Sequence, residues 1–261
     1  MKYTYDDFDF KIPLEESDYA ENSKLITERM ESILDYSLKN KKNRIILNTN
    51  LRKGLPLENI NKIAGPLIES WAQEMFEDVL INPENIFNLV NVEAQARLGL
   101  ADVILQFEKS SDNPKSVTAN VDVKATSSDI KGAGKGPNIT SFSRIRTAYV
   151  TEPNFYFIVL SIKHHVISKA NAETNLIDGI MEITDFKAYD FKFLSSNDLN
   201  YNPALGTGQF QIKDIHYVSQ EKRTTWEFCQ LLDQKYLASS RRTIIDWYRE
   251  AVRNKWIKGL K

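Results

Sequence analysis

Two aspartates and a lysine near the middle of the chain have the residue types and spacing of a metal-dependent hydrolytic site. Asp102 lies in the segment ADVILQF, and Asp122 and Lys124 lie in VDVK. Residues two apart on a β-strand point to the same face, so Asp122 and Lys124 project together. Two carboxylates can hold Mg²⁺, with water and phosphate oxygens completing its coordination. We therefore predict a Mg²⁺ site for phosphate chemistry, with Asp102 and Asp122 as the metal ligands.

Lys124 is the third candidate catalytic residue. Its charge suits it to orient a water molecule or to stabilise negative charge that develops on a phosphate. Neighbouring carboxylates favour the protonated form of a lysine, so we expect an electrostatic role rather than that of a general base. Asp followed later by Asp-x-Lys also occurs by chance, and the alternative is a structural ion pair on an exposed strand.

Glu69 is a fourth candidate, on a helix that precedes these strands. It follows Pro66, which we place in the first turn of that helix. A glutamate there can reach a water molecule near the metal or a second metal ion. The alternative is that Glu69 lies on a solvated helix face, as we expect for Glu74 and Glu77.

The segment that follows Lys124, residues 125–147, is rich in glycine and in groups that can contact DNA. Gly132, Gly134 and Gly136 predict a mobile loop whose backbone can approach a ligand closely. Basic side chains can contact phosphates, and amide and hydroxyl groups can contact bases. The predicted contacts here are Lys131, Lys135, Asn138, Thr140, Ser141, Ser143, Arg144 and Arg146. The alternative is an ordinary surface loop.

A second polar segment, residues 201–213, carries the amide side chains of Asn202, Gln209 and Gln211. Such amides can pair with adenine in the major groove. The alternative is an exposed loop and strand face. The three histidines, His164, His165 and His216, do not have the spacing of a metal site, and we expect His216 to be structural.

The surrounding sequence predicts helices, then a central sheet, then helices. Apolar spacing predicts a helix over 20–38, and strands are predicted over 101–107, 117–124, 155–162, 181–194 and 208–218. The polar run SSDNPKS joins the first two strands in a hairpin, which brings Asp102 close to Asp122. Thr224 and Ser240 are predicted helix N-caps. One side of the last helix is predicted to carry Ile244, Ile245, Tyr248, Val252 and Trp256. This order predicts an α/β or α+β domain.

Length and composition are those of a globular protein. The 261 residues, 42% of them hydrophobic, fit a single domain over 1–261, with an N-terminal helical segment over about 1–60 and C-terminal helices over about 223–261. The only cysteine, Cys229, excludes an internal disulfide and a cysteine-based zinc site. We find no signal peptide and no apolar run that could span a membrane, and we expect a cytoplasmic location.

The net charge of −1 argues against a nucleic-acid partner when it is taken alone. The charge is distributed unevenly, however. Residues 1–36 carry four basic and ten acidic side chains, whereas residues 219–261 carry ten basic and five acidic ones. A neutral total can therefore conceal a basic face, and the alternative is an ordinary solvated surface.

At these residues the chain resembles the PD-(D/E)xK nucleases, and within them the type II restriction endonucleases that cut to blunt ends. The segments that carry the resemblance span most of the chain and include NVEAQARLGLADVILQF, VDVKATSSDI, GPNITSFSRIRTAY and DFKFLSSNDLNYNPALGTGQ. The resemblance implies a restriction-endonuclease-like fold, with a central mixed β-sheet flanked by helices. It implies a bacterial homodimer that cuts double-stranded DNA at the centre of the palindrome GTTAAC and leaves 5′-phosphates. A cognate DNA methyltransferase is the implied functional partner.

The resemblance also assigns roles to individual residues. Asp102 and Asp122 match the two metal-binding acids, Lys124 the motif lysine, and Glu69 a helical acid. Asn138, Asn202 and Ala204 fall where such enzymes place residues near the DNA bases. Ala101 replaces the proline of the motif name, which is a frequent replacement in these nucleases. Three alternatives stay open: a repair or junction-resolving nuclease of the same fold, a non-catalytic sequence-specific DNA-binding protein, and a cytosolic protein without a nucleic-acid role.

Overall fold

The computed structural model describes residues 3–95, 99–110, 113–204 and 206–261. Contacts within the chain divide it into two compact units. The first, here called the sheet unit, comprises residues 22–134 and 157–190. The second, the helical unit, comprises the residues before 22 together with 135–156 and 191–261. The organisation as a single nuclease domain stays a prediction.

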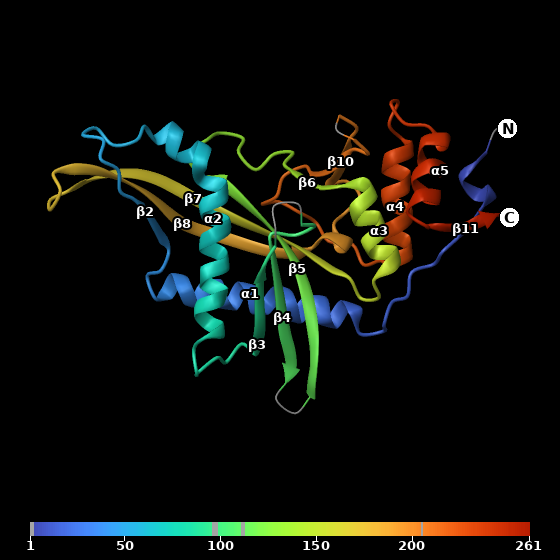
Figure 1. The fold of residues 1–261 in the computed structure, drawn as a ribbon, viewed down its shortest axis with the longest axis horizontal. Helices are drawn as coiled ribbons and strands as arrows, with labels where there is room; N and C mark the ends of the chain where they lie inside the picture. The colour runs from blue at the N-terminus through green and yellow to red at the C-terminus, as the bar shows by residue number, and fades with distance from the viewer. Residues whose placement is uncertain (1–2, 96–98, 111–112, 205) are drawn as a thin grey trace. The chain divides into compact units, whose positions relative to one another are not determined.

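The sheet unit is built on a six-stranded mixed sheet with the strand order β2-β8-β7-β5-β4-β3 (Figure 1). Its strands are β2 (Arg44–Leu47), β3 (Leu89–Ala94), β4 (Val103–Ser110), β5 (Asn113–Ser127), β7 (Tyr156–Asn171) and β8 (Leu176–Asp190). The predicted buried strand over 155–162 is the first half of β7, in which every residue from 156 to 162 is buried. The strand predicted over 181–194 begins earlier, and its end is the 3-10 helix η2 (Phe191–Phe193).

Strands β4 and β5 form the predicted antiparallel hairpin. Val103 is paired with Val121 and Phe107 with Val117, and all four side chains are buried. Alternate residues of both strands therefore face the core, as the period of two requires. The tip of the hairpin at residues 111–112 lies outside the described residues.

Two long helices, α1 (Tyr19–Lys39) and α2 (Leu57–Leu80), accompany the sheet. Helix α1 confirms the helix predicted over 20–38. It is joined to the sheet by polar contacts: Arg29 donates to the carbonyl oxygen of Lys109 on β4, and Glu31 accepts from the amide of Ala188 on β8. Helix α2 packs against β3 and β5. In Figure 1, α2 crosses in front of β7, β8 and α1, and α1 passes behind β3, β4 and β5.

Pro66 is in the interior of α2, and its predicted place in the first helical turn is wrong. The helix begins at Leu57, with Pro56 as its N-cap residue. A proline within a helix cannot donate the backbone hydrogen bond of its turn, and it bends the helix. Figure 1 shows α2 changing direction in its first half. The apolar face beyond Pro66 is as predicted, since Ile68, Trp71 and Phe76 are buried.

The helical unit combines three α-helices and two short 3-10 helices with two small sheets. Its elements are η1 (Tyr5–Asp7), β1 (Phe8–Phe10), β6 (Asn138–Ser141), α3 (Phe142–Thr151), η2, β9 (Leu199–Asn202), β10 (Gln209–Ile212), α4 (Thr225–Leu237), α5 (Ile244–Arg253) and β11 (Ile257–Leu260). Strand β1 pairs with β11, and β10 lies between β6 and β9. The strand predicted over 208–218 is shorter in the structure, where β10 covers only Gln209–Ile212. The N-terminal segment predicted as helical over about 1–60 also contains the strands β1 and β2.

Capping residues define the two C-terminal helices. Thr224 caps α4 as predicted, and its side chain accepts a hydrogen bond from the amide of Glu227 in a capping box. Ser240 is not an N-cap; Thr243 caps α5 by the same arrangement with Asp246. Trp256, which was predicted on one side of the last helix, lies beyond the end of α5 at Arg253.

The buried residues of α5 are Trp247 and Ala251, which are four apart and therefore share one face. Ile245 and Val252 are about half exposed, at 47% and 52%. Trp256 is buried, but it follows the end of the helix and immediately precedes β11.

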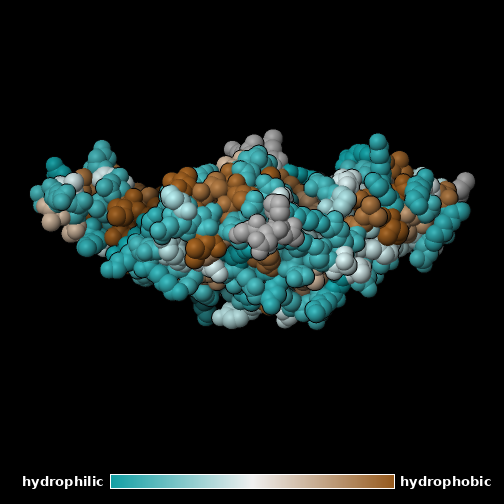
Figure 2. Space-filling model, turned by 90° about the horizontal axis from the view of Figure 1, so that it is seen from below, coloured by the Kyte–Doolittle hydropathy of each residue, from teal (hydrophilic) through white to brown (hydrophobic). Residues whose placement is uncertain are grey.

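The fold class is α+β, with a central mixed sheet flanked by helices, as predicted. In the view of Figure 2, hydrophobic residues occur in small groups among hydrophilic ones. Among the helices of the described part of the chain, none is long and apolar enough to cross a bilayer.

Candidate active site and DNA-contact residues

Asp102 and Asp122 are brought together by the β4–β5 hairpin. Asp102 immediately precedes β4, and its backbone amide donates to the carbonyl oxygen of Val121 at 2.9 Å. The amide of Val123 donates in return to Oδ2 of Asp102 at 2.7 Å. The backbone on either side of Asp122 therefore fixes both the main chain and the carboxylate of Asp102.

Asp122 is a buried carboxylate in the middle of the sheet unit. Its side chain is 7% exposed, and burial raises its pKa to about 7, against an opposing effect from Lys124. Asp102 and Glu69 add smaller repulsive contributions that also raise this pKa. A carboxylate held in this environment gains from any cation that approaches it.

Lys124 lies on the same face of β5 as Asp122, as the strand period predicts. Its Nζ is 2.7 Å from Oδ2 of Asp122, and its side chain is 21% exposed. The ammonium group can therefore reach both the buried carboxylate and solvent. This is the position from which a lysine can orient a water molecule or contact a phosphate.

Glu69 on α2 faces the same group of charges. Burial and the charge of Asp102 raise its pKa, and Lys124 opposes this rise. The side chain is half-buried, whereas Glu74 on the same helix is exposed. The structure thus brings Glu69 together with Asp102, Asp122 and Lys124, all within the sheet unit.

The donor set fits a hard divalent cation. Oδ2 of Asp122 is buried, and its ion-pair partner is the ammonium group of Lys124, at 2.7 Å. A carboxylate has about four lone-pair positions, so Asp122 keeps positions for a divalent cation beside Lys124. Among the described residues, no three acidic, histidine or cysteine side chains form a ready-made metal cluster. Mg²⁺ is commonly held by one or two carboxylates, with water and phosphate oxygens as its other ligands.

The segment after Lys124 is better anchored at its start than the predicted mobile loop. Strand β5 continues to Ser127, and the amide of Ser128 donates to the carbonyl oxygen of His164 on β7 at 2.7 Å. Oδ2 of Asp129 accepts from the amide of Val166 at 2.8 Å, and its Oδ1 contacts Nδ1 of His165. Sequence reasoning missed this anchor, because it depends on residues more than thirty positions away.

The glycines of this segment have the backbone freedom that was expected of them. Gly132, Gly134 and Gly136 have φ angles of 81°, 85° and 63°, which glycine adopts without strain. Lys131 and Lys135 are both exposed. These two side chains keep the accessibility that a phosphate contact requires.

The three-stranded sheet of the helical unit gathers the predicted base-contact residues from two distant segments. Gln209 is paired with Ser141 on one side and with Asn202 on the other. Gln211 is paired in the same way with Asn138, and its Nε2 donates to Oδ1 of Asn138 at 2.9 Å. Cross-strand partners share a face, so these polar side chains form two short rows.

Arg146 is a core residue, and we withdraw it from the predicted DNA contacts. Its side chain is fully buried on α3 and forms a forked ion pair with Asp233 of α4, with Nη2 3.0 Å from Oδ2. Trp247 also donates to Asp233, at 2.9 Å. The sequence gives no sign of this arrangement, since Asp233 is 87 positions away and an arginine in a basic segment normally predicts exposure.

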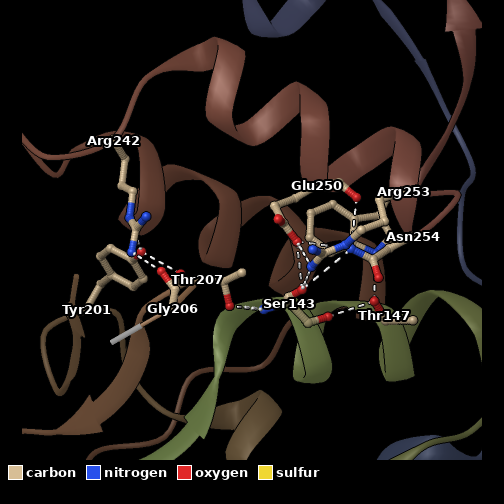
Figure 3. A network of polar contacts seen from close by, with 10 residues as sticks. Ser143, Thr147, Tyr201, Gly206, Thr207, Arg242, Glu250, Arg253 and Asn254 are labelled. Atoms are coloured by element: carbon tan, nitrogen blue, oxygen red, sulfur yellow. Dashed lines mark hydrogen bonds and ion pairs between the residues drawn. The ribbon is translucent and has the colours of Figure 1, made fainter. Parts of the chain in front are cut away.

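Ser143 and Thr140 are also withdrawn from the predicted DNA contacts. Ser143 is the second residue of α3 and does not lie in a loop. Its hydroxyl donates to Glu250 of α5 at 2.9 Å (Figure 3). Arg253 and Asn254 contact the same serine hydroxyl. Thr140 is 6% exposed on β6. Neither side chain is available to a base in this structure.

The remaining predicted contacts are accessible. Asn138, Arg144 and Ala204 are exposed, and Ser141, Asn202, Gln209 and Gln211 are half-buried. Oδ1 of Asn202 accepts from the amide of Ala204 at 3.0 Å, which gives this loop an internal turn.

Comparison with known proteins connects this site to a nuclease family. The family model described as type II restriction endonuclease HpaI matches residues 6–255. The type II restriction enzyme HpaI of Haemophilus parainfluenzae is 61% identical over 254 residues, which cover 97% of this chain and 99% of that protein.

Proposed function

Because the chain belongs to the HpaI family of type II restriction endonucleases, we propose that it cuts double-stranded DNA at a specific short palindrome. The observation that supports this most directly is the buried carboxylate of Asp122, which is paired with Lys124 and lies beside Asp102. A carboxylate in that state suits divalent-cation chemistry, and the adjacent ammonium group suits a phosphate substrate.

We propose Mg²⁺ as the cation, with Asp102 and Asp122 as its protein ligands. When bound, Mg²⁺ would acidify water and offset the negative charge that builds on the scissile phosphate. Asp102 is held for this role by the amide of Val123, which fixes the direction of its carboxylate. Asp122 contributes a buried carboxylate beside the ammonium group of Lys124.

Lys124 would orient the attacking water and stabilise the charge on the phosphate. Its Nζ is held by Asp122, and its partial exposure leaves one side open to substrate. Glu69 would bind a water molecule near the same site, and burial together with the charge of Asp102 raises its pKa. The reaction would leave a 5′-phosphate and a 3′-hydroxyl.

DNA contacts would come from two sets of side chains. Lys131, Lys135 and Arg144 would contact phosphates, which fix the position of the protein on the duplex. The two polar rows of the three-stranded sheet would contact bases, and they comprise Asn138, Ser141, Asn202, Gln209 and Gln211, with Ala204 in the adjoining loop.

We propose a homodimer acting on GTTAAC and cutting at its centre to give blunt ends. A two-fold dimer presents one active site to each strand of a palindrome. A cognate DNA methyltransferase that protects the same sequence in the bacterial cytoplasm would be its functional partner.

The proposal is tested by digesting a sequenced plasmid in the presence of Mg²⁺ and mapping both strands at every new end. We expect blunt ends with 5′-phosphates at the centre of GTTAAC and at no other sequence. Staggered ends, or cutting at branched junctions rather than at this palindrome, would refute the specificity that we propose.

A further inference from the structure

Arg242 holds the loop that carries the candidate base-contact residues Asn202 and Ala204. It lies between α4 and α5 in the sequence, and its guanidinium group donates to three acceptors on this loop, of which those of Tyr201 and Gly206 are drawn in Figure 3. Nε donates to the hydroxyl oxygen of Tyr201 at 2.9 Å, and Nη2 donates to the carbonyl oxygens of Pro203 at 3.0 Å and Gly206 at 2.7 Å. We call Arg242 and these three acceptors the Arg242 clamp.

Tyr201 extends the clamp toward the second DNA-contact segment. Its hydroxyl donates to the carbonyl oxygen of Thr207 at 2.7 Å. The hydroxyl oxygen of Thr207 in turn accepts from the amide of Ser143 at 3.4 Å, and the carbonyl oxygen of Gly208 accepts from the amide of Phe142 at 3.0 Å. The loop is thereby fixed against the start of α3, directly after the β6 strand that holds Asn138 and Ser141.

The clamp depends on the shape of an arginine side chain. The planar guanidinium group presents several N–H donors in a rigid fork, whereas a lysine ammonium group is a compact charge on a flexible stem. The group also lies over the ring of Tyr236, with 5.4 Å from Cζ to the ring centroid. Its hydrogen bonds go to carbonyl and hydroxyl oxygens of the protein, and therefore Arg242 acts on loop geometry rather than as a simple phosphate contact.

Gly208 shows how closely the loop is fitted around Tyr201. Its φ angle is +88°, and a Cβ atom placed on it would lie 2.1 Å from the hydroxyl oxygen of Tyr201. Gly206 also has a positive φ angle, of +51°, but a Cβ atom there would meet nothing within 4 Å. Both glycines therefore adopt a positive φ angle that other residues rarely adopt. Only at Gly208 would a side chain also collide with a neighbouring residue.

We propose that Arg242 is a positioning residue for sequence discrimination, acting through Tyr201 and the loop backbone on Asn202 and Ala204. This inference rests on the proposed function, since it assumes that the loop contacts bases. Base discrimination requires side chains placed to a fraction of an ångström, and loops reach that precision only when surrounding contacts fix them. The Arg242 clamp supplies such contacts from outside the loop.

The test compares Arg242→Lys and Arg242→Gln with Arg241→Gln. Arg241 is the exposed neighbour, so its substitution removes the same charge without touching the clamp. For each protein, kcat/KM is measured on duplexes containing GTTAAC and on duplexes that differ from it by one base pair. We expect both Arg242 variants to lower the ratio of kcat/KM on GTTAAC to kcat/KM on the altered duplexes by about tenfold or more. A small misplacement of groups that position a substrate has effects of this order. Arg241→Gln should leave the ratio within about twofold of wild type.

An unchanged ratio in both Arg242 variants would overturn the inference. So would an equal loss at all sequences accompanied by a lower Tm, because that pattern belongs to a purely structural residue. If the Arg242 variants do not fold, Tyr201→Phe decides, since it removes only the hydroxyl that joins Arg242 to Thr207. A further matched pair is Gly208→Ala, expected to lower the ratio, against Gly206→Ala, expected to change it less.

Failure of the proposed function is distinguishable from failure of this inference. Wild-type protein that cuts no specific sequence refutes the former before any variant is compared. Wild-type protein that cuts GTTAAC while every clamp variant keeps its discrimination refutes the latter alone.

Discussion

Nζ of Lys124 lies 2.7 Å from Oδ2 of Asp122, and yet the pKa of this aspartate is raised to about 7 rather than lowered. Burial is the largest cause, and it outweighs the attraction of the lysine. The ionised carboxylate is therefore unfavourable in the protein unless a further cation joins it. Metal binding and the stability of the metal-free protein are thus linked at one residue.

Asp122→Asn should stabilise the protein in the presence of a chelator. The folded pKa of Asp122 is about 7, whereas an unfolded aspartate has a pKa of about 3.9. The native state therefore holds a proton that the unfolded state loses, and wild-type stability falls as pH rises between these values. Asparagine does not ionise, so the gain in Tm should grow up to pH 7 and then level off. We expect a rise of about 3 °C at pH 8 and a smaller one at pH 5 by thermal unfolding in EDTA. A lower Tm for the variant at both pH values would contradict this reading.

Arg146→Ala should destabilise the protein strongly. Removing one partner of a buried ion pair leaves Asp233 as an uncompensated charge, with a typical cost of about 3–5 kcal/mol. The matched control is Arg144→Ala, because Arg144 is exposed and two positions away on the same helix. That change should alter the free energy of unfolding by less than about 0.5 kcal/mol and should weaken DNA binding in Ca²⁺. Urea unfolding of both variants measures the difference, and equal stabilities would show that Arg146 is not the core residue described above.

Glu69→Gln should slow cleavage without abolishing it. Glu69 is on α2, whereas the two predicted ligands are at the β4–β5 hairpin, and residues that support metal ligands typically contribute about 10- to 100-fold. Glu74→Gln is the control, since Glu74 is exposed on the same helix. Single-turnover rates at saturating Mg²⁺ test this. Wild-type rates for Glu69→Gln would place Glu69 among the solvated residues of α2.

His164→Gln should reduce the decrease in unfolding free energy that occurs as the pH becomes acidic. His164 is buried, its Nε2 lies 3.1 Å from Oδ1 of Asn61, and burial lowers its pKa. An unfolded histidine binds a proton below about pH 6.5, so the unfolded state is favoured as pH falls from that value through the lowered folded pKa. Wild-type stability should therefore decline between pH 7 and 5 more steeply than that of the variant. Parallel curves of unfolding free energy against pH would exclude this contribution.

The local features of the site could be predicted from sequence because they depend on neighbouring residues. Alternating valines and a polar turn specify the β4–β5 hairpin, and the hairpin places Asp102 opposite Asp122. Thr224 and Glu227 similarly specify a capping box within four residues. Each of these arrangements follows from periods of two or of 3.6 residues.

The wrong predictions concern interactions between distant residues. Arg146 is buried because Asp233 on another helix pairs with it. The start of the loop after Lys124 is fixed because Asp129 meets β7. The Arg242 clamp joins residues about forty positions apart, and the only sequence sign of it was the basic character of the C-terminal segment. Pairings of this kind require the fold before they can be recognised.

The most direct test of the active site compares cleavage with binding in Lys124→Ala and Asp122→Asn. The matched control is Lys163→Ala, since Lys163 forms an ion pair with Asp185 at 3.1 Å in the same sheet. Single-turnover cleavage of a GTTAAC duplex is measured in Mg²⁺, and the Kd for the same duplex is measured in Ca²⁺. The active-site variants should lose cleavage by about 1,000-fold or more while their Kd stays within about tenfold of wild type, and Lys163→Ala should cleave normally. Cleavage near the wild-type rate by either active-site variant would contradict the assignment of Asp122 and Lys124 as catalytic residues.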